Sequence, residues 1–170
     1  MNLYNVYIGL GSNLGDRKLN LMEAIKSLQT THCLQILQVS SFYKNPAWGV
    51  INQPWFLNAA LSGETHYTPF QLLKFVKDLE IFLGRVKSYQ WGPRLIDIDI
   101  LLYGNEQINS YELTIPHPGI TQRPFVLGPL LEISPDLRDL ISGKLYQSFL
   151  KDLTLRGLNQ LELYSPPPAI

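Results

Sequence analysis

The sequence has a single cysteine, no long hydrophobic run and no excess of charge of either sign. Because Cys33 is the one cysteine among 170 residues, the chain cannot form an internal disulfide bond, and we expect a reducing, cytoplasmic location. No apolar stretch approaches the roughly 18 residues of a membrane-spanning helix, and the start of the chain lacks the pattern of a secretory signal. We therefore expect no contact with membranes.

Charge is scarce and balanced. Lysine and arginine together number 14, aspartate and glutamate also 14, and the charged fraction is 16%. Nucleic-acid binding depends on many Lys and Arg contacts to phosphates, so we expect no nucleic-acid partner. With 45% hydrophobic residues, the chain can bury roughly two-thirds of its unfolded surface. We expect one domain over residues 1–170, acting as a monomer, with a flexible tail at about 165–170.

The first half of the chain alternates between strand and helix signals. Residues 6–10 are rich in β-forming side chains and run into a Gly, Ser and Asn cluster, which predicts a strand and a turn. Asp16 can cap a following helix. Residues 34–43 and 56–61 then favour two strands. The predicted inner face of the first helix consists of Leu19, Met22, Ile25 and Leu28.

The second half begins with the clearest helix. Thr68 as N-cap, Pro69 at the first helical position and Gly84 at the end bound it. Residues 95–103 predict a central strand, and residues 125–133 a short helix limited by Gly128 and Pro129. The β–α–β–β–α–β order predicts an α+β, ferredoxin-like sandwich with a mainly antiparallel sheet, helices on one face and extra C-terminal helical segments.

Two aspartates stand out on the last of these strands. Asp97 and Asp99 are two residues apart, so both side chains point to one face, with their Cα atoms about 6.7 Å apart. Such carboxylates repel each other by about 2.4 kcal/mol at an effective dielectric of 20, so cations should lie nearby. A Mg²⁺ site fits, and so does a solvated face with ordinary ion pairs. The opposite face would carry Ile96, Ile98, Ile100 and Leu102.

Further charged residues flank the two aspartates in sequence. Arg85 follows the second helix and Arg94 precedes Asp97, and arginine side chains match phosphate oxygens. Glu80 lies at the edge of an apolar helix face, where it needs either a ligand or an ion pair with Arg85 or Lys77. These residues are consistent with a phosphate bound through a metal ion.

His117 stands between two prolines and has two readings. It could contact a phosphate, or it could be a turn histidine bonded to the backbone. The three histidines and one cysteine show no metal-ligand spacing, which argues against zinc. The dinucleotide-binding fingerprint and the P-loop motif are both absent, so ATP would have to be bound in another way.

The motifs together resemble a known enzyme family. They span residues 4 to about 135 and keep a fixed order: Tyr7-Ile8-Gly9-Leu10-Gly11-Ser12-Asn13-Leu14-Gly15-Asp16-Arg17, Gln53-Pro54-Trp55-Phe56-Leu57-Asn58, Leu83-Gly84-Arg85, Trp91-Gly92-Pro93-Arg94-Leu95-Ile96-Asp97-Ile98-Asp99-Ile100, and Ile115-Pro116-His117-Pro118 with Arg123 and Phe125. This set resembles the 6-hydroxymethyl-7,8-dihydropterin pyrophosphokinases of folate biosynthesis. The run from Trp91 to Ile100 is the most specific.

The resemblance implies a reaction and its site. The family transfers pyrophosphate from ATP to the pterin hydroxymethyl group and releases AMP, with two Mg²⁺ ions held by residues that match Asp97 and Asp99. The expected catalytic residues are Arg85, Arg94, Asp97 and Asp99. The expected ATP contacts are Glu80, Lys87, Trp91, Arg94, Ile100, Thr114, His117 and Arg123. The expected pterin contacts are Asn45, Pro46, Trp48, Phe56, Asn58 and Phe125.

The chain departs from the family pattern at a few positions. Lys87 and Gln90 stand where arginines are frequent in the family, and Asn45 and Trp48 stand where a threonine and a smaller aliphatic residue are expected. Neither pair of departures involves the aspartates.

Two other functions use the same residues. A two-metal phosphohydrolase or nuclease would need the aspartates and a positioned water, but no pterin pocket. A binding module without catalysis would hold pterin or nucleotide whether or not the carboxylates are present. Formation of AMP from ATP, with and without pterin and Mg²⁺, separates the three readings.

Overall fold

The computed structural model describes residues 2–47, 52–84 and 93–170. Helices α1 to α4 and strands β1 to β8, with one 3₁₀ helix, follow each other along these ranges. Their bounds are β1 Tyr4–Ser12, α1 Arg17–Thr30, β2 Gln35–Val39, β3 Phe42–Asn45, β4 Phe56–Thr65, α2 Pro69–Phe82, β5 Asp97–Tyr103, β6 Ile108–Asn109, β7 Thr114–Ile115, η1 Ile120–Gln122, α3 Pro124–Ile133, α4 Tyr146–Leu155 and β8 Glu162–Ser165.

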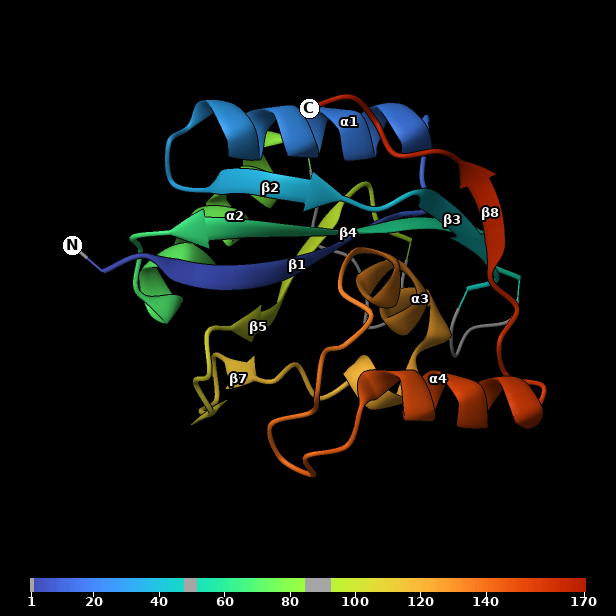
Figure 1. Cartoon of the computed structure of the whole chain (residues 1–170). Coiled ribbons are helices and arrows are strands. Elements are labelled where there is room, and N and C mark those ends of the chain that lie inside the picture. Colours follow the sequence, from blue (N-terminus) through green and yellow to red (C-terminus); the bar gives the residue numbers. More distant parts are fainter. Residues whose placement is uncertain (1, 48–51, 85–92) are drawn as a thin grey trace.

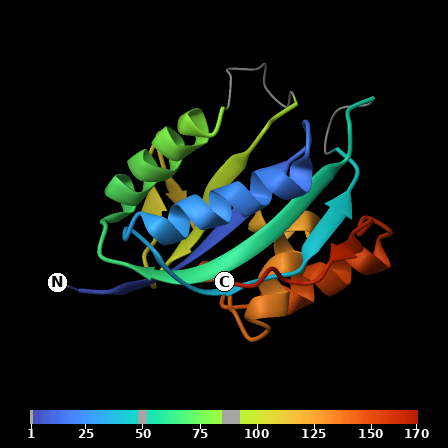
Figure 2. The ribbon, with the colours of Figure 1, turned by 90° about the horizontal axis from the view of Figure 1, so that it is seen from above.

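The elements form three layers. The main sheet has the strand order β5-β1-β4-β3-β8, with β2 also beside β4, and each of its described pairings is antiparallel. Helices α1 and α2 lie side by side over one face, and α3 and α4 lie on the other (Figures 1 and 2). The mixed α/β class and antiparallel sheet are as predicted. Among the described residues no helix is long and apolar enough to cross a membrane.

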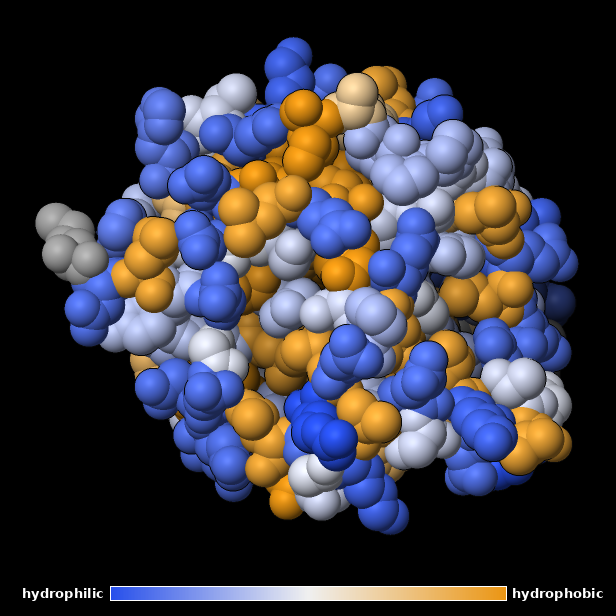
Figure 3. All heavy atoms as spheres, in the orientation of Figure 1, coloured by the Kyte–Doolittle hydropathy of each residue, from blue (hydrophilic) through white to orange (hydrophobic). Residues whose placement is uncertain are grey.

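The sheet separates two hydrophobic clusters. Ile8 and Leu61 face α1 and α2, where they pack with Leu28 and Val76. The second cluster joins the opposite face to α3 and α4 through residues that include Leu101, Leu127, Leu130 and Tyr146. Because both faces of the sheet are covered, β4 is buried at each position from Leu57 to Leu61 and not only at alternate ones. On the outside, hydrophobic and hydrophilic residues are intermixed over the face in Figure 3.

The predicted helix starts are confirmed by their hydrogen bonds. Asp16 accepts a bond from the backbone N–H of Leu19 at 3.0 Å. Thr68 and Gln71 form a reciprocal capping box at the start of α2, with Pro69 as the first helical residue. These caps satisfy backbone N–H groups that have no partner inside a helix.

The predicted inner face of α1 is partly wrong. Leu19 is 54% exposed, and the buried positions are Leu21, Ala24, Ile25 and Leu28. A repeat of three residues drifts around a helix that has 3.6 residues per turn, whereas the observed spacing of three and four stays on one side.

Strand β5 differs from its prediction in position and shape. It begins at Asp97, two residues later than expected, and among the described strands it pairs with β1 alone, so it is an edge strand. Its apolar sequence reflects burial by helices on both faces, not a central place in the sheet. A register shift opposite Tyr7 and Ile8 also moves Leu102 to the face of Leu101, away from Ile100.

Three other boundaries need correction. The strand expected over residues 34–43 is two strands, because the chain bends at Ser40 and Ser41, where the Ser40 hydroxyl bonds backbone groups. Helix α3 continues past Gly128 and Pro129, since a proline in the second turn removes one intrahelical bond only. The expected tail at 165–170 begins inside β8, and no helix or strand follows Ser165.

Candidate functional site

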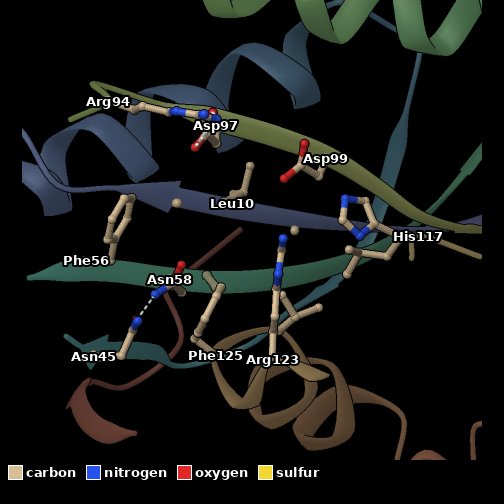
Figure 4. A pocket seen from close by; sticks show the side chains of 15 residues that line it. Leu10, Asn45, Phe56, Asn58, Arg94, Asp97, Asp99, His117, Arg123 and Phe125 are labelled. Carbon is tan, nitrogen blue, oxygen red and sulfur yellow. Dashed lines mark hydrogen bonds and ion pairs between the residues drawn. The ribbon is translucent and has the colours of Figure 1, made fainter. Parts of the chain in front are cut away.

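A hollow of about 130 Å³ lies on the α3 face of the sheet. We call it the central hollow. Its floor comes from β1, β4 and β5, and its wall from residues 117–126 (Figure 4). The lining side chains and backbone belong to Gly9, Leu10, Gly11, Asn45, Phe56, Asn58, Ala59, Arg94, Asp97, Asp99, Leu101, His117, Arg123, Phe125 and Val126.

The strand register creates the floor of this hollow. Gly11 of β1 is paired with Asp97 on one side and Asn58 on the other, and Gly9 is likewise paired with Asp99 and Ala60. Directly opposed residues in a sheet share a face, so each aspartate faces β4 across a residue without a side chain. An added Cβ at Gly11 would lie 3.1 Å from Oδ1 of Asn58. The glycines therefore keep the floor open.

Each aspartate has a cation beside it. Arg94 places one guanidinium nitrogen 3.1 and 3.3 Å from the two carboxylate oxygens of Asp97. Lys77 of α2 lies 3.6 Å from Asp99 and 3.1 Å from Glu80. The prediction that both aspartates share one face with compensating cations nearby is confirmed. Arg94 was foreseen for Asp97, whereas Lys77 as the partner of Asp99 was not.

The carboxylate pair suits a metal that arrives with its substrate. The described residues contain no group of three or more His, Cys, Asp or Glu that could hold a metal ion alone. Mg²⁺ is commonly bound by one or two carboxylates, with substrate phosphates and water completing its shell. Asp97 and Asp99 fit this kind of site, because both line the hollow and each forms an ion pair with a basic side chain.

Asn13 holds the Arg94 side of the central hollow in place. This residue is fully buried; its Oδ1 accepts a bond from the backbone N–H of Arg94 at 2.7 Å, and its own N–H donates to the Arg94 carbonyl at 3.0 Å. Its Nδ2 donates to Gln53 and to the carbonyl of Pro54, both at 3.2 Å. Asn13 belongs to the motif over residues 7–17, but no role was predicted for it, because its partners are 40 to 81 residues away in sequence.

The other end of the hollow is aromatic and amide-lined. Phe56 and Phe125 reach it from β4 and from the first turn of α3 (Figure 4). The amide of Asn58 donates a hydrogen bond to Asn45, whose own amide donates to the Pro46 carbonyl at 2.8 Å. Four of the predicted pterin contacts therefore meet here. Pro46 lines an adjoining groove instead.

His117 lies near Asp99 at the edge of the central hollow (Figure 4). Its Nδ1 accepts a bond from the N–H of Gly119 at 3.0 Å, so the turn-histidine reading is correct, yet the ring also lines the central hollow. Burial lowers its pKa, Asp99 opposes this, and Arg123 and Lys77 add to it. A neutral ring whose Nδ1 accepts presents Nε2–H as a donor.

A second hollow of about 300 Å³ lies beside the first, and we call it the side hollow. It is lined by Lys77, Asp99, Ile100, Thr114 and His117, among others. Asp99 and His117 border both spaces, so the two hollows adjoin. The predicted ATP contacts Ile100 and Thr114 thus meet His117 and one metal-site candidate.

Glu80 has a structural partner close to the site. It is 2% exposed, and its Oε1 accepts bonds from the N–H of Ile98 at 2.7 Å and from Lys77 at 3.1 Å. The predicted ion pair with Lys77 is present. Glu80 thereby binds the outer backbone edge of β5, and it is not among the described residues that line either hollow.

Several predicted site residues lie outside the described residues. They are Trp48, Arg85, Lys87 and Trp91, together with the departure noted at Gln90. Conversely, the structure adds Gly9, Gly11, Asn13 and Lys77 to the site. The glycines could have been found from their repeat of two on a strand, which matches the repeat of the aspartates.

Comparisons of this chain with known proteins agree on one family. The family model for 7,8-dihydro-6-hydroxymethylpterin-pyrophosphokinase (HPPK) matches residues 7–135. A 2-amino-4-hydroxy-6-hydroxymethyldihydropteridine pyrophosphokinase of Methylorubrum extorquens is 42% identical over 156 residues, covering 92% of this chain and 98% of that protein. The enzyme of the same name from Aquifex aeolicus is 43% identical over 151 residues, covering 89% and 93%.

Solved structures show the same fold at low identity. The HPPK-DHPS of Plasmodium falciparum in complex with pteroate matches 94% of this chain with a TM-score of 0.73 and 15% identity. An HPPK-DHPS in complex with substrates matches with a TM-score of 0.74 and 13% identity. The chain spans 44% and 45% of these two longer proteins, so the match concerns one part of each.

Proposed function

This chain belongs to the 7,8-dihydro-6-hydroxymethylpterin-pyrophosphokinase family, and we propose that the two adjoining hollows are where it carries out the reaction of that family. The enzyme transfers pyrophosphate from ATP to the hydroxymethyl group of 6-hydroxymethyl-7,8-dihydropterin in folate biosynthesis. A bond forms between the hydroxymethyl oxygen and the β-phosphorus. The bond from that phosphorus to the oxygen shared with the α-phosphate breaks, AMP leaves, and the hydroxyl proton is lost.

One observation carries the assignment of the site. The register places Asp97, Gly11 and Asn58 in one row across three strands, so a carboxylate and an amide face each other over an open floor. A phosphoryl acceptor that contacts Asn58 can thus extend its reactive arm toward the aspartates. Holding two reactants in line in this way is a major part of the catalysis of phosphoryl transfer.

On the acceptor side, flat apolar and polar groups suit a pterin ring. Phe56 and Phe125 supply two aromatic faces, and the linked amides of Asn45 and Asn58 supply donors and acceptors for the ring edge. A flat heterocycle buried in a pocket needs this combination of stacking and a few fixed polar contacts. We assign Pro46 and Trp48 to the rim of the same pocket from the family resemblance.

On the phosphate side, basic groups face the aspartates. Two Mg²⁺ ions bound by Asp97 and Asp99 together with the ATP phosphates would supply charge neutralisation and alignment. With the aspartates holding the metal ions, Arg94 and Lys77, which pair with them in this structure, would instead contact phosphate oxygens. Arg123 and His117 line the same space on the opposite wall (Figure 4). Their guanidinium and Nε2–H groups would donate hydrogen bonds to the phosphate oxygens from that side.

The nucleotide would extend from the central hollow into the side hollow. Ile100 and Thr114 line that space, and Glu80 lies next to it, where it holds the backbone of Ile98. We assign Arg85, Lys87 and Trp91 to the triphosphate and its cover from the family resemblance. We also propose that the chain acts as a monomer in the cytoplasm, and its mass in size-exclusion chromatography with light scattering tests the first point.

The activity is tested by AMP formation. With ATP and Mg²⁺, AMP should appear with 6-hydroxymethyl-7,8-dihydropterin present, and neither without pterin nor in EDTA. Asp97→Asn and Asp99→Asn should each lower kcat by at least about a hundredfold, because charge neutralisation at the phosphates is worth several kcal/mol. Pterin affinity should change little. Asp78→Asn is the matched control, since Asp78 forms an exposed ion pair with Lys74 at 2.6 Å on α2.

Other outcomes point to the alternatives. AMP or phosphate release without pterin would favour a phosphohydrolase. Pterin binding without any product would favour a binding module. Near-normal turnover in both aspartate variants would contradict the metal assignment, even if the pyrophosphokinase activity itself is present.

A further inference from the structure

A carboxylate outside both hollows joins α3 to β3. Oε1 of Glu132 accepts bonds from the backbone N–H and the hydroxyl of Ser41, at 3.0 and 2.8 Å. Its Oε2 accepts a bond from the Tyr43 hydroxyl at 2.5 Å. The two oxygens of one side chain are thus bound to Tyr43 of β3 and to Ser41, the residue just before that strand. We call this group of three residues the Glu132 clamp.

The clamp lies beside the aromatic end of the central hollow, about two helical turns further along α3. Glu132 follows Phe125 by seven residues, which is close to two helical turns, so both side chains leave the same side of α3 about 10.5 Å apart. Tyr43 precedes Asn45 by two residues on β3 and therefore shares its face. Helix α3 and strand β3 consequently face each other at two positions along the helix. One is the clamp, and the other is where Phe125 and Asn45 line the hollow.

The clamp adds little to the burial of α3. Leu127 and Leu130 are fully buried and Leu131 is 8% exposed, so apolar packing already holds the helix on the sheet. Apolar contacts are not directional and permit small sliding movements, whereas three hydrogen bonds to one carboxylate fix a lateral position. Strand β3 is short and has only β4 and β8 as described neighbours. The clamp therefore sets where α3 lies along β3.

We propose that Glu132 is a positioning residue for the acceptor: by fixing α3 against β3 it sets the gap between Phe125 and Asn45, and hence the fit of the heterocycle. This inference rests on the proposed assignment of pterin to the aromatic end of the central hollow. ATP binds against β5 and residues 114–123, which the clamp does not touch, so the effect of losing it is specific to the acceptor.

Three variants test the proposal in the 170-residue chain. Glu132→Ala should raise the KM for pterin about tenfold, with the KM for ATP within about twofold of the unaltered enzyme. Glu132→Gln should restore most of the affinity, because its amide oxygen can still accept from Ser41. Tyr43→Phe removes one bond of three and should raise the pterin KM about threefold.

The matched control is Tyr7→Phe. The Tyr7 hydroxyl lies 3.0 Å from the Ser134 hydroxyl, so it also ties the sheet to the same end of α3, but from β1 and not from β3. This variant should leave both KM values within about twofold, although it loses a comparable hydrogen bond. Thermal unfolding of all four variants then separates a loss of stability from a loss of acceptor binding.

Several results would overturn the proposal. An unchanged pterin KM in Glu132→Ala, an equal rise for pterin and ATP, or the same rise in Tyr7→Phe would each do so. If Glu132→Ala does not fold, an unchanged pterin KM in Tyr43→Phe serves the same purpose. Phe125→Ala tells the two levels apart, because normal pterin binding in that variant contradicts the pocket assignment rather than the clamp.

Discussion

Asn13 shows how one buried side chain can organise the candidate site. It bonds both backbone groups of Arg94 and also reaches Gln53 and Pro54. These partners flank the two aspartates on one side and Phe56 on the other. Amide side chains suit this role because a single Asn offers two donors and an acceptor at once. Its loss is therefore expected to affect both substrates together.

Asn13→Ala leaves the partly buried N–H of Arg94 without its partner, which costs about 1–3 kcal/mol of unfolding free energy. We expect urea unfolding to show a loss of this size and kcat/KM to fall for ATP and pterin alike. Asn20→Ala is the matched control, since Asn20 bonds Ser12 and Leu14 in the same turn but no residue of the hollow. A fall for one substrate alone would contradict the shared role.

At the scale of elements, features set by neighbouring residues were predicted correctly, whereas the pairing of strands was not. The caps of α1 and α2 could be predicted, because Asp16 and Thr68 each accept a hydrogen bond from the residue three positions later in the sequence. The edge position of β5 could not be predicted, because it depends on which strands pair. The apolar sequence of β5 is equally suited to a central strand. Asp97 and Asp99 were found from alternation, whereas Glu132 binds residues about 90 positions earlier.

The capping box of α2 offers a test of how this helix serves the site. Thr68→Ala should lower the unfolding free energy by about 1 kcal/mol, because an N-cap bond is lost. Turnover under saturating substrates should stay unchanged, since Glu80 and Lys77 lie in the last turns of α2, far from its start. Thr30→Ala is the control, as its hydroxyl bonds only carbonyls of its own helix. A large fall in kcat would contradict this separation.

At the scale of the whole molecule, one carboxylate in the C-terminal part links stability to pH. Asp139 is 7% exposed. Burial raises its pKa, but hydrogen bonds from Ser142, Ile141 and Tyr146 lower it, and the net pKa lies below its ordinary value. The folded chain then binds this proton less readily than the unfolded chain. Stability from Asp139 is present above about pH 3.9 and is lost as the pH falls through the folded pKa.

Asp139→Asn should therefore lower the unfolding free energy at pH 7 and matter progressively less as the pH approaches 3. Urea unfolding of the variant and the unaltered chain at a series of pH values measures this difference. Asp136→Asn, at an exposed position in the same loop, is the control and should show no such trend. A constant difference across the series would mean that lost packing, not charge, is responsible.

The open floor of the central hollow implies a trade-off between stability and the proposed activity. Glycine in a strand costs roughly 0.5–1 kcal/mol relative to alanine, because the unfolded chain is freer. At Gly9 an added Cβ would meet Leu101 at 3.4 Å, an ordinary contact. Gly9→Ala should therefore raise the melting temperature while it narrows the space beside Asp99 and lowers turnover. A search for thermostable variants by folding alone would thus select against the enzyme's own function.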